Sequence, residues 1–357
     1  MKFYIDARWV RTDYHDGISR YTAGLLQGMQ EAGHDFIALI YDDAQLTMLP
    51  QGIRYEKVHH PISWRELFLA RTLNARGADV VFSPLQVMGF WGRRYKLILT
   101  LQDIIYYKHP KPPTNLAWYV RLVWRLFHMA RWPQRVLLDR SDHVVTVSHT
   151  SKKFIEQYRL TTKNITVVYN APTESDTPDH AVRPTKNLVY MGSFMPYKNV
   201  ETLIDGMHML DPSYTLHLLS KITPERQREL LSRTTETGRI VFHNGVSDEE
   251  YRKLLAASHC LVTATKEEGF GLPLTEAQQL GVPVVCSDLD VLREVAGEGA
   301  LYFDPDSPAM LAEKVRQLED ETMRRRLIAE GVRHAAQFRW VRSADALYAL
   351  AADLHSQ

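Results

Sequence analysis

Short β-rich runs alternate with helix-length segments along the whole chain, and this alternation restricts the fold more than any other feature. The pattern is typical of parallel sheets that carry helices on both faces. The strands expected in the first half are Lys2–Asp6, Phe36–Tyr41, Val80–Phe82, Lys96–Leu101, Val144–Val147 and Ile165–Tyr169. Those expected in the second half are Asn187–Met191, Tyr214–Leu219, Arg239–Phe242, Cys260–Ala264, Pro283–Cys286 and Ala300–Phe303.

The chain has 357 residues, enough for two such domains at roughly 100–200 residues each. Between the two sets of strands, Asn170 to Thr185 is rich in Pro, Asp and Thr, which is typical of a linker. We therefore predict an α/β protein with Rossmann-like domains at 1–170 and 187–337, joined by a linker at 171–186. Ligands of open α/β sheets bind at the carboxyl ends of the strands, so we expect the site in a cleft between the two domains.

The amino-acid composition limits the class of protein and the cellular compartment. A chain that is 45% hydrophobic and 24% charged is neither disordered nor fibrous. Its two cysteines, Cys260 and Cys286, are too few for a disulfide framework and lack the paired spacing of a zinc site. Asp6 and Arg8 interrupt the start of the chain where a signal peptide needs an apolar run. We expect a cytoplasmic protein.

The charge is divided unevenly. Residues 1–170 hold 23 Lys/Arg against 14 Asp/Glu, whereas the net charge of the whole chain is only +1. The segment 111–140 holds six Lys/Arg and one acid, and on a helix starting after Pro113 its apolar residues form one stripe while Arg121, Arg125 and His128 form another. This is the composition of an amphipathic helix on an anionic membrane surface, and a core helix with an arginine-covered outer face fits it too. No recognised nucleic-acid module is present, so we expect no nucleic-acid partner.

A glycine-rich turn lies within KEEGFGLPLTEAQQLGVPVVCSD, Lys266 to Asp288. It leads from a strand into a helix, with Pro273 in the first helical turn. Gly269 and Gly271 flank Phe270 and allow a ligand to approach the backbone. Free amides at the helix start direct the positive end of its dipole at that ligand, and these are expected at Gly271, Leu272 and Leu274. The turn therefore predicts an anion site.

Two acids flank this turn. We expect Glu276 in the first helical turn, where a carboxylate beside a bound anion is explained if it accepts two hydrogen bonds from a ribose diol. Glu268 would face the group beyond the phosphates. The alternative is that Glu276 is a helix acid favoured by the dipole and that Glu267 and Glu268 are a solvated pair. A dinucleotide fingerprint fails because Leu274 occupies the third glycine position.

Further candidates follow other strands. In YMGSFMPYKN, Tyr190 to Asn199, a turn at Gly192 and Ser193 precedes Lys198, which we expect to open a helix and to bind a phosphate there; a solvated lysine is the alternative. Lys221 ends the next strand and adds a third contact.

Two candidates lie in the first domain. Gly17 lies between the first strand and its helix, where its backbone would approach the diphosphate or simply form a turn. Gln102 and Asp103 end the Lys96–Leu101 strand and would face the cleft, although Asp103 would equally cap a helix or turn.

With these residues the sequence resembles a family 4 glycosyltransferase (glycosyl transferases group 1) of the GT-B fold, over most of its length. Six elements stand in family order: DGISRY (16–21), TVSHTSK (146–152), VVYNAP (167–172), MGSFMPYKN (191–199), EGFGLPLTE (268–276) and ALYFDP (300–305). The resemblance implies a retaining transferase that uses a nucleotide-diphosphate sugar and no metal. It also implies that Phe338–Gln357 is a last helix crossing back onto the first domain.

The resemblance assigns roles residue by residue. Glu276 would hold the ribose hydroxyls, Lys198 the diphosphate, Gly17 and Gly271–Leu272 the phosphates through their amides, and Glu268 the transferred sugar. The catalytic residues that the resemblance implies are Glu268, Asp103 and Gln102.

Two positions depart from the family pattern. Gly192-Ser193 stands where many members have Gly-Arg, so one diphosphate cation is absent or is supplied by Lys221. Gln102-Asp103 stands where members often have His-Asp, which leaves the donor sugar open.

The family's front-face mechanism is the one expected. The nucleoside diphosphate departs, the acceptor hydroxyl attacks the same face, and the leaving phosphate takes the proton. By resemblance to short-chain members we expect transfer of a hexose, first of all mannose from GDP-mannose, to a glycan or lipid-linked acceptor of bacterial surface polysaccharide assembly. The site would then lie at the inner face of the membrane. The alternatives are a non-catalytic sugar-nucleotide-binding subunit and a GT-B epimerase or phosphorylase relative.

Overall fold

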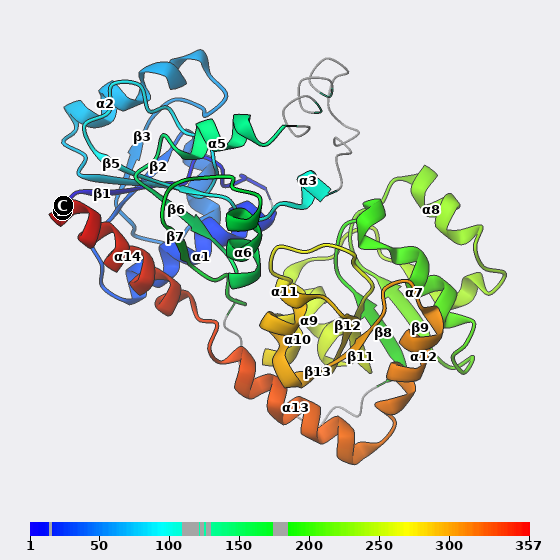
Figure 1. Cartoon of the computed structure of the whole chain (residues 1–357). Helices are drawn as coiled ribbons and strands as arrows, with labels where there is room; N and C mark the ends of the chain where they lie inside the picture. The colour runs from blue at the N-terminus through cyan, green and yellow to red at the C-terminus, as the bar shows by residue number, and fades with distance from the viewer. Residues whose placement is uncertain (14–15, 109–120, 122–124, 126–129, 174–184) are drawn as a thin grey trace. The chain divides into compact units, whose positions relative to one another are not determined.

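The computed structural model describes residues 1–13, 16–108, 121, 125, 130–173 and 185–357, which form two compact units. The N-terminal unit comprises Met1–Ala171 and Phe338–Gln357, and the C-terminal unit comprises Pro172–Gln337 (Figure 1). Most of the predicted linker, 174–184, lies outside the described residues. Each unit is a parallel sheet with helices on it, which confirms the predicted α/β class.

The N-terminal unit contains a seven-stranded sheet in the order β3-β2-β1-β4-β5-β6-β7, with every neighbouring pair parallel. Its strands are β1 (Phe3–Asp6), β2 (Ile37–Ile40), β3 (Tyr55–Lys57), β4 (Val80–Ser83), β5 (Lys96–Thr100), β6 (His143–Thr146) and β7 (Ile165–Val167). The six predicted strands are present with slightly shifted ends. The seventh, β3, was not predicted because it is an edge strand whose side chains are half-buried or exposed, so it lacks the apolar run of a buried strand.

Helices cover this sheet, and the last one comes from the end of the chain. They are α1 (Gly17–Glu31), η1 (Asp43–Met48), η2 (Trp64–Phe68), α2 (Leu69–Ala75), α3 (Ile105–Lys108), α5 (Trp132–Leu138), α6 (His149–Gln157) and α14 (Trp340–Ser356). Helix α14 packs on α1 so closely that a Cβ on Gly28 would lie 2.2 Å from the carbonyl oxygen of Trp340. The predicted return of the C-terminal helix to the first domain is therefore confirmed.

The C-terminal unit contains a six-stranded parallel sheet in the order β10-β9-β8-β11-β12-β13. Its strands are β8 (Asn187–Tyr190), β9 (Thr215–Leu218), β10 (Ile240–Phe242), β11 (Cys260–Thr263), β12 (Val284–Ser287) and β13 (Ala300–Phe303). Its helices are η3 (Pro196–Lys198), α7 (Val200–Met207), α8 (Pro224–Leu231), η4 (Thr237–Arg239), α9 (Asp248–Ala256), α10 (Leu272–Gln279), α11 (Asp290–Ala296), η5 (Gly297–Gly299), α12 (Pro308–Gln317) and α13 (Glu321–Ala335). All six strands were predicted from their apolar runs.

Only part of the predicted amphipathic segment 111–140 can be placed. Residues 109–120, 122–124 and 126–129 lie outside the described residues, and α5 begins separately at Trp132. In the described part of the chain, no helix is both long enough and apolar enough to cross a membrane.

Candidate active site

The turn between β11 and α10 has the geometry of an anion site. Gly271 caps α10 in the left-handed region (φ 96°), where a side chain would be strained, and a Cβ there would also lie 3.1 Å from Leu292. The first amides of a helix have no partner within that helix, so those of Gly271 and Leu272 can serve a ligand. The prediction of a third free amide, at Leu274, is wrong, because its N–H donates to the carbonyl of Gly271 at 3.0 Å. Gly269 and Phe270 are buried beneath the turn.

Lys198 and Glu268 form an ion pair beside this turn. Their side chains are 15% and 21% exposed, so neither is a solvated surface charge. The amide of Lys266 donates to the carbonyl of Tyr197 at 2.7 Å and fastens the two loops together. Lys198 does not open α7 as predicted, because it ends η3 and Asn199 in the left-handed region (φ 52°) separates it from that helix. The pair places a cation and an acid at one point of the carboxyl edge of the sheet.

Glu276 lies one turn further along α10. It is the fifth residue of the helix, not in the first turn as predicted, because α10 begins at Leu272. Tyr251 of α9, which is almost fully buried, donates its hydroxyl to Oε2 of Glu276 at 2.8 Å. This hydrogen bond fixes the carboxylate. Tyr251 could not be singled out from the sequence, because a tyrosine on an amphipathic helix resembles any core residue.

The loop after β8 is held by its own hydrogen bonds. The amide of Gly192 donates to Oγ of Ser220 at 3.2 Å, and the hydroxyl of Tyr190 donates to the carbonyl of Ser193 at 2.7 Å. A Cβ on Gly192 would lie 2.7 Å from that hydroxyl, so the loop requires glycine there. Burial raises the pKa of Tyr190 well above its usual value, which keeps the hydroxyl a donor.

Two basic side chains lie near this loop. Lys221 is exposed, and its aliphatic stem packs on Gly245. Arg226 of α8 donates through Nε to the carbonyl of Phe194 at 3.2 Å and pairs with Glu201 at 2.5 Å and Glu229 at 2.8 Å. Arg226 therefore has a structural role in the loop that lacks the family's usual arginine at 193.

The remaining candidates belong to the N-terminal unit. Gly17 is the exposed first residue of α1, and a Cβ on it would meet no atom within 4 Å, so its backbone is open to approach. Asp103 accepts a hydrogen bond from the amide of Ile105 at 3.0 Å, which is the capping role considered above. Gln102 precedes it, and within the described residues its buried Nε2 atom has no hydrogen-bond partner.

Family models match both units. Residues 15–172 match the model described as Glycosyltransferase Family 4, and residues 174–334 match that described as Glycosyl transferases group 1. The chain belongs to the family 4 glycosyltransferases. The predicted family is thereby confirmed, and the candidate residues of the C-terminal unit lie inside the second match.

Curated relatives of this glycosyltransferase include two O-antigen enzymes. The chain is 29% identical over 192 residues to the O-antigen chain mannosyltransferase RfbU of Salmonella typhimurium, a match that covers 53% of the chain and 54% of RfbU. It is 35% identical over 159 residues to the O-antigen chain mannosyltransferase B of Escherichia coli, covering 43% and 42%. The chain thus spans about half the length of the curated relatives it matches.

Solved structures of other glycosyltransferases share the fold. Sucrose-phosphate synthase from Thermosynechococcus elongatus superposes with a TM-score of 0.75 at 18% identity, covering 99% of each chain. Anabaena HepE in complex with UDP-glucose superposes with a TM-score of 0.73 at 20% identity, covering 99% of this chain and 100% of HepE. These likenesses confirm the predicted GT-B fold.

Proposed function

We propose that this glycosyltransferase moves mannose from GDP-mannose to a hydroxyl of a glycan or lipid-linked acceptor in surface polysaccharide assembly. The proposed transfer retains the anomeric configuration and uses no metal ion. Mannose is supported by the relatives described above, which are O-antigen mannosyltransferases. The observation that carries the proposal is the Lys198–Glu268 ion pair at the start of α10, with Glu276 one turn further along.

Each part of the donor would bind a different group of these residues. The diphosphate binds the first amides of α10. It also replaces Glu268 as the ion-pair partner of Lys198, because two phosphates carry more negative charge than one carboxylate. Glu276, oriented by Tyr251, accepts hydrogen bonds from the two ribose hydroxyls. Glu268 is then free to accept hydrogen bonds from the hydroxyl groups of the sugar.

The chemical step follows from that placement. The bond between the sugar C1 and the phosphate oxygen breaks, the acceptor oxygen bonds to C1 on the same face, and the acceptor proton passes to the departing phosphate. Lys198 and the helix amides stabilise the charge that grows on that phosphate. Asp103 and Gln102 remain predicted members of the catalytic set.

We further propose that the enzyme works at an anionic membrane surface on the cytoplasmic side, in keeping with the basic segment 111–140. A catalytically silent sugar-nucleotide-binding subunit and a GT-B epimerase or phosphorylase relative are the competing functions. Only the transferase would release nucleoside diphosphate in response to an acceptor, whereas an epimerase or phosphorylase relative and a silent subunit would not.

The test measures free nucleoside diphosphate released from GDP-, UDP- and ADP-sugars, with and without a lipid-linked glycan extract. The proposal predicts release from GDP-mannose only when the extract is present, and loss of release in Lys198→Ala. Lys253→Ala is the matched control, because Lys253 is an exposed lysine of the same unit that pairs with Glu249. Release without acceptor, or no release with any donor, contradicts the proposal.

A further inference from the structure

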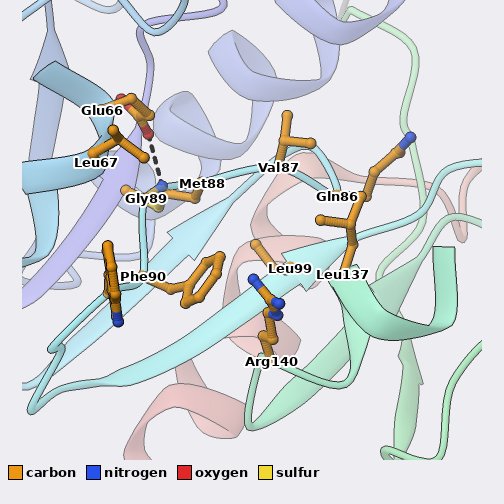
Figure 2. Close-up of a pocket in the computed structure, with 11 residues that line it drawn as sticks. Glu66, Leu67, Gln86, Val87, Met88, Gly89, Phe90, Leu99, Leu137 and Arg140 are labelled. Carbon is orange, nitrogen blue, oxygen red and sulfur yellow. Dashed lines mark hydrogen bonds between the residues drawn. The ribbon is translucent and has the colours of Figure 1, made fainter. Parts of the chain in front are cut away.

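A pocket of about 580 Å³ opens in the N-terminal unit, between η2, the segment after β4 and the end of α5 (Figure 2). Its size falls within the ~300–1,000 Å³ of small-molecule sites. Apolar side chains form most of the wall, including Met88, Phe90, Leu99 and Leu137. None of the residues assigned to sugar transfer lines it.

The carboxylate of Glu66 in the wall is satisfied within the protein. Gly89 approaches η2 so closely that a Cβ on it would lie 2.0 Å from the carbonyl oxygen of Glu66, and its amide donates to Oε1 of Glu66 at 2.8 Å. The buried guanidinium of Arg8 lies 2.7 Å from the same carboxylate. Glu66 is therefore held in place by partners within the protein, although Arg8 shares its charge with Asp6 at 2.8 Å.

The mouth of the pocket is unusually apolar for a protein surface. We define the apolar rim as Leu67, Val87 and Trp91, which line the pocket, together with Trp64 at the start of η2, three residues before Leu67. Trp64, Leu67 and Trp91 are 71%, 59% and 75% exposed. Exposed apolar side chains gathered in one place mark an interaction surface. Tryptophan, with its apolar body and polar N–H, favours the boundary between lipid and water.

Two arginines lie over aromatic rings at or next to the pocket. The guanidinium of Arg140 lies over the ring of Phe90 with 4.5 Å to its centre, and that of Arg71 lies over the ring of Phe68 with 5.5 Å. Among the described residues, no carboxylate forms an ion pair with either of these two arginines. Unpaired cations beside an apolar opening complement a lipid that has an anionic head group and a hydrocarbon tail.

We propose that the apolar rim docks on a bilayer containing anionic phospholipid and that one acyl chain enters the pocket, with the arginines at the phosphates. The inference rests on the membrane partner proposed above, but it assigns the contact to η2 and the segment after β4, to which only the end of 111–140 contributes, through Leu137 and Arg140. An apolar protein partner explains the rim but not the arginines, and a soluble small molecule explains the pocket but not the exposed tryptophans.

Co-sedimentation of the full chain with vesicles tests the docking. Phosphatidylcholine vesicles containing phosphatidylglycerol should bind it, and pure phosphatidylcholine vesicles should bind it far less. Arg71→Gln and Arg140→Gln should each lower the partition coefficient about fivefold. Leu67→Glu with Trp91→Glu should lower it more than roughly tenfold, because both the apolar contact and the charge balance are lost.

The matched control carries the same charge change elsewhere. Met310→Glu with Val332→Glu alters two C-terminal-unit residues that are 38% and 37% exposed, and binding should stay within about twofold. Equal binding to both vesicle types, or equal loss in the control and the rim variant, overturns the docking surface. Binding of a polyisoprenyl phosphate without any binding to vesicles overturns it as well.

Methyl NMR of ¹³C-methionine tests the acyl chain, since Met88 lines the pocket. Phosphatidylglycerol with a spin label on its acyl chain should broaden the Met88 signal, and Leu137→Trp, which fills the pocket, should abolish that broadening while vesicle binding persists. An unaffected Met88 signal overturns the assignment. Arg121→Gln with Arg125→Gln should keep the broadening. If that variant alone abolishes vesicle binding, the surface around Arg121 and Arg125 is the contact and the apolar rim fails. No sugar transfer enters either assay, so failure here is distinct from failure of the transferase proposal.

Discussion

Lys198 and Glu268 pair across 70 positions of sequence because β8 and β11 are neighbouring parallel strands. The carboxyl ends of such strands meet at one edge of the sheet, and each residue lies in the segment that follows its strand. The backbone hydrogen bond from Lys266 to Tyr197 holds the two segments in contact. The cation assigned to the diphosphate thus lies against the acid assigned to the sugar.

The first prediction concerns the cation. Lys198→Ala should weaken nucleoside-diphosphate binding roughly 10- to 150-fold, since a hydrogen bond to a charged group contributes ~1.5–3 kcal/mol. Titration calorimetry measures this directly, with Lys253→Ala as the control that should bind like the parent. Unchanged affinity in Lys198→Ala would remove this lysine from the site.

The second prediction concerns Tyr251, which we assign to positioning Glu276. Tyr251→Phe removes one neutral-donor hydrogen bond, so the affinity for nucleoside diphosphate should fall about 2- to 10-fold, less than in Glu276→Ala. Tyr214→Phe is the matched control, because Tyr214 makes the same kind of bond, to Glu319 at 2.8 Å, outside the candidate site. If both tyrosine variants lose affinity equally, Tyr251 acts only through the stability of the unit.

The third prediction is a pH dependence. Burial alone would raise the pKa of Glu66, but the hydrogen bond and charge of Arg8, with the amide of Gly89 and the ring of His59, lower it below its ordinary 4.5. A group with a depressed folded pKa stabilises the fold above its unfolded pKa, and that contribution is lost as the pH falls through the folded value. Urea unfolding should show the parent losing stability below about pH 4.5 more steeply than Glu66→Gln. Identical slopes would contradict this.

The fourth prediction concerns the return of the chain to the N-terminal unit. A methyl group on Gly28 would lie 2.2 Å from Trp340, so Gly28→Ala should destabilise this unit by about 1–3 kcal/mol through overpacking of α1 on α14. Thermal unfolding should show the loss. Gly238→Ala, where a Cβ meets no atom within 4 Å, should leave the midpoint unchanged, and an equal shift in both would refute the packing argument.

The sequence predicted most of the fold because its buried strands are apolar runs that need no partner to be recognised. Strand β3 was not predicted because an exposed edge strand contains no apolar run. Helix ends were less certain: a shift in where α10 begins moved Glu276 out of the first turn and left the amide of Leu274 bonded to Gly271.

Site residues were predictable where backbone chemistry demands a residue type. Gly271, with its positive φ, is such a position. The partners of Lys198 and Glu276 were not predictable, since the ion pair and the Tyr251 bond join residues that only the strand order brings together. The apolar rim was not predictable either, because the identity of Trp64 and Trp91 does not reveal that they are exposed.

The measurement that tests the central claim most directly compares Glu268→Gln and Glu276→Gln by steady-state kinetics and calorimetry, with product anomers resolved by proton NMR. A residue that acts chiefly in the transition state lowers kcat, whereas one that binds the donor throughout raises KM. Glu268→Gln should bind nucleoside diphosphate almost normally yet lose orders of magnitude in transfer, Glu276→Gln should show the reverse emphasis, and the product should keep the donor's anomeric configuration. Transfer by Glu268→Gln at the parental rate, or an inverted product, would contradict the account.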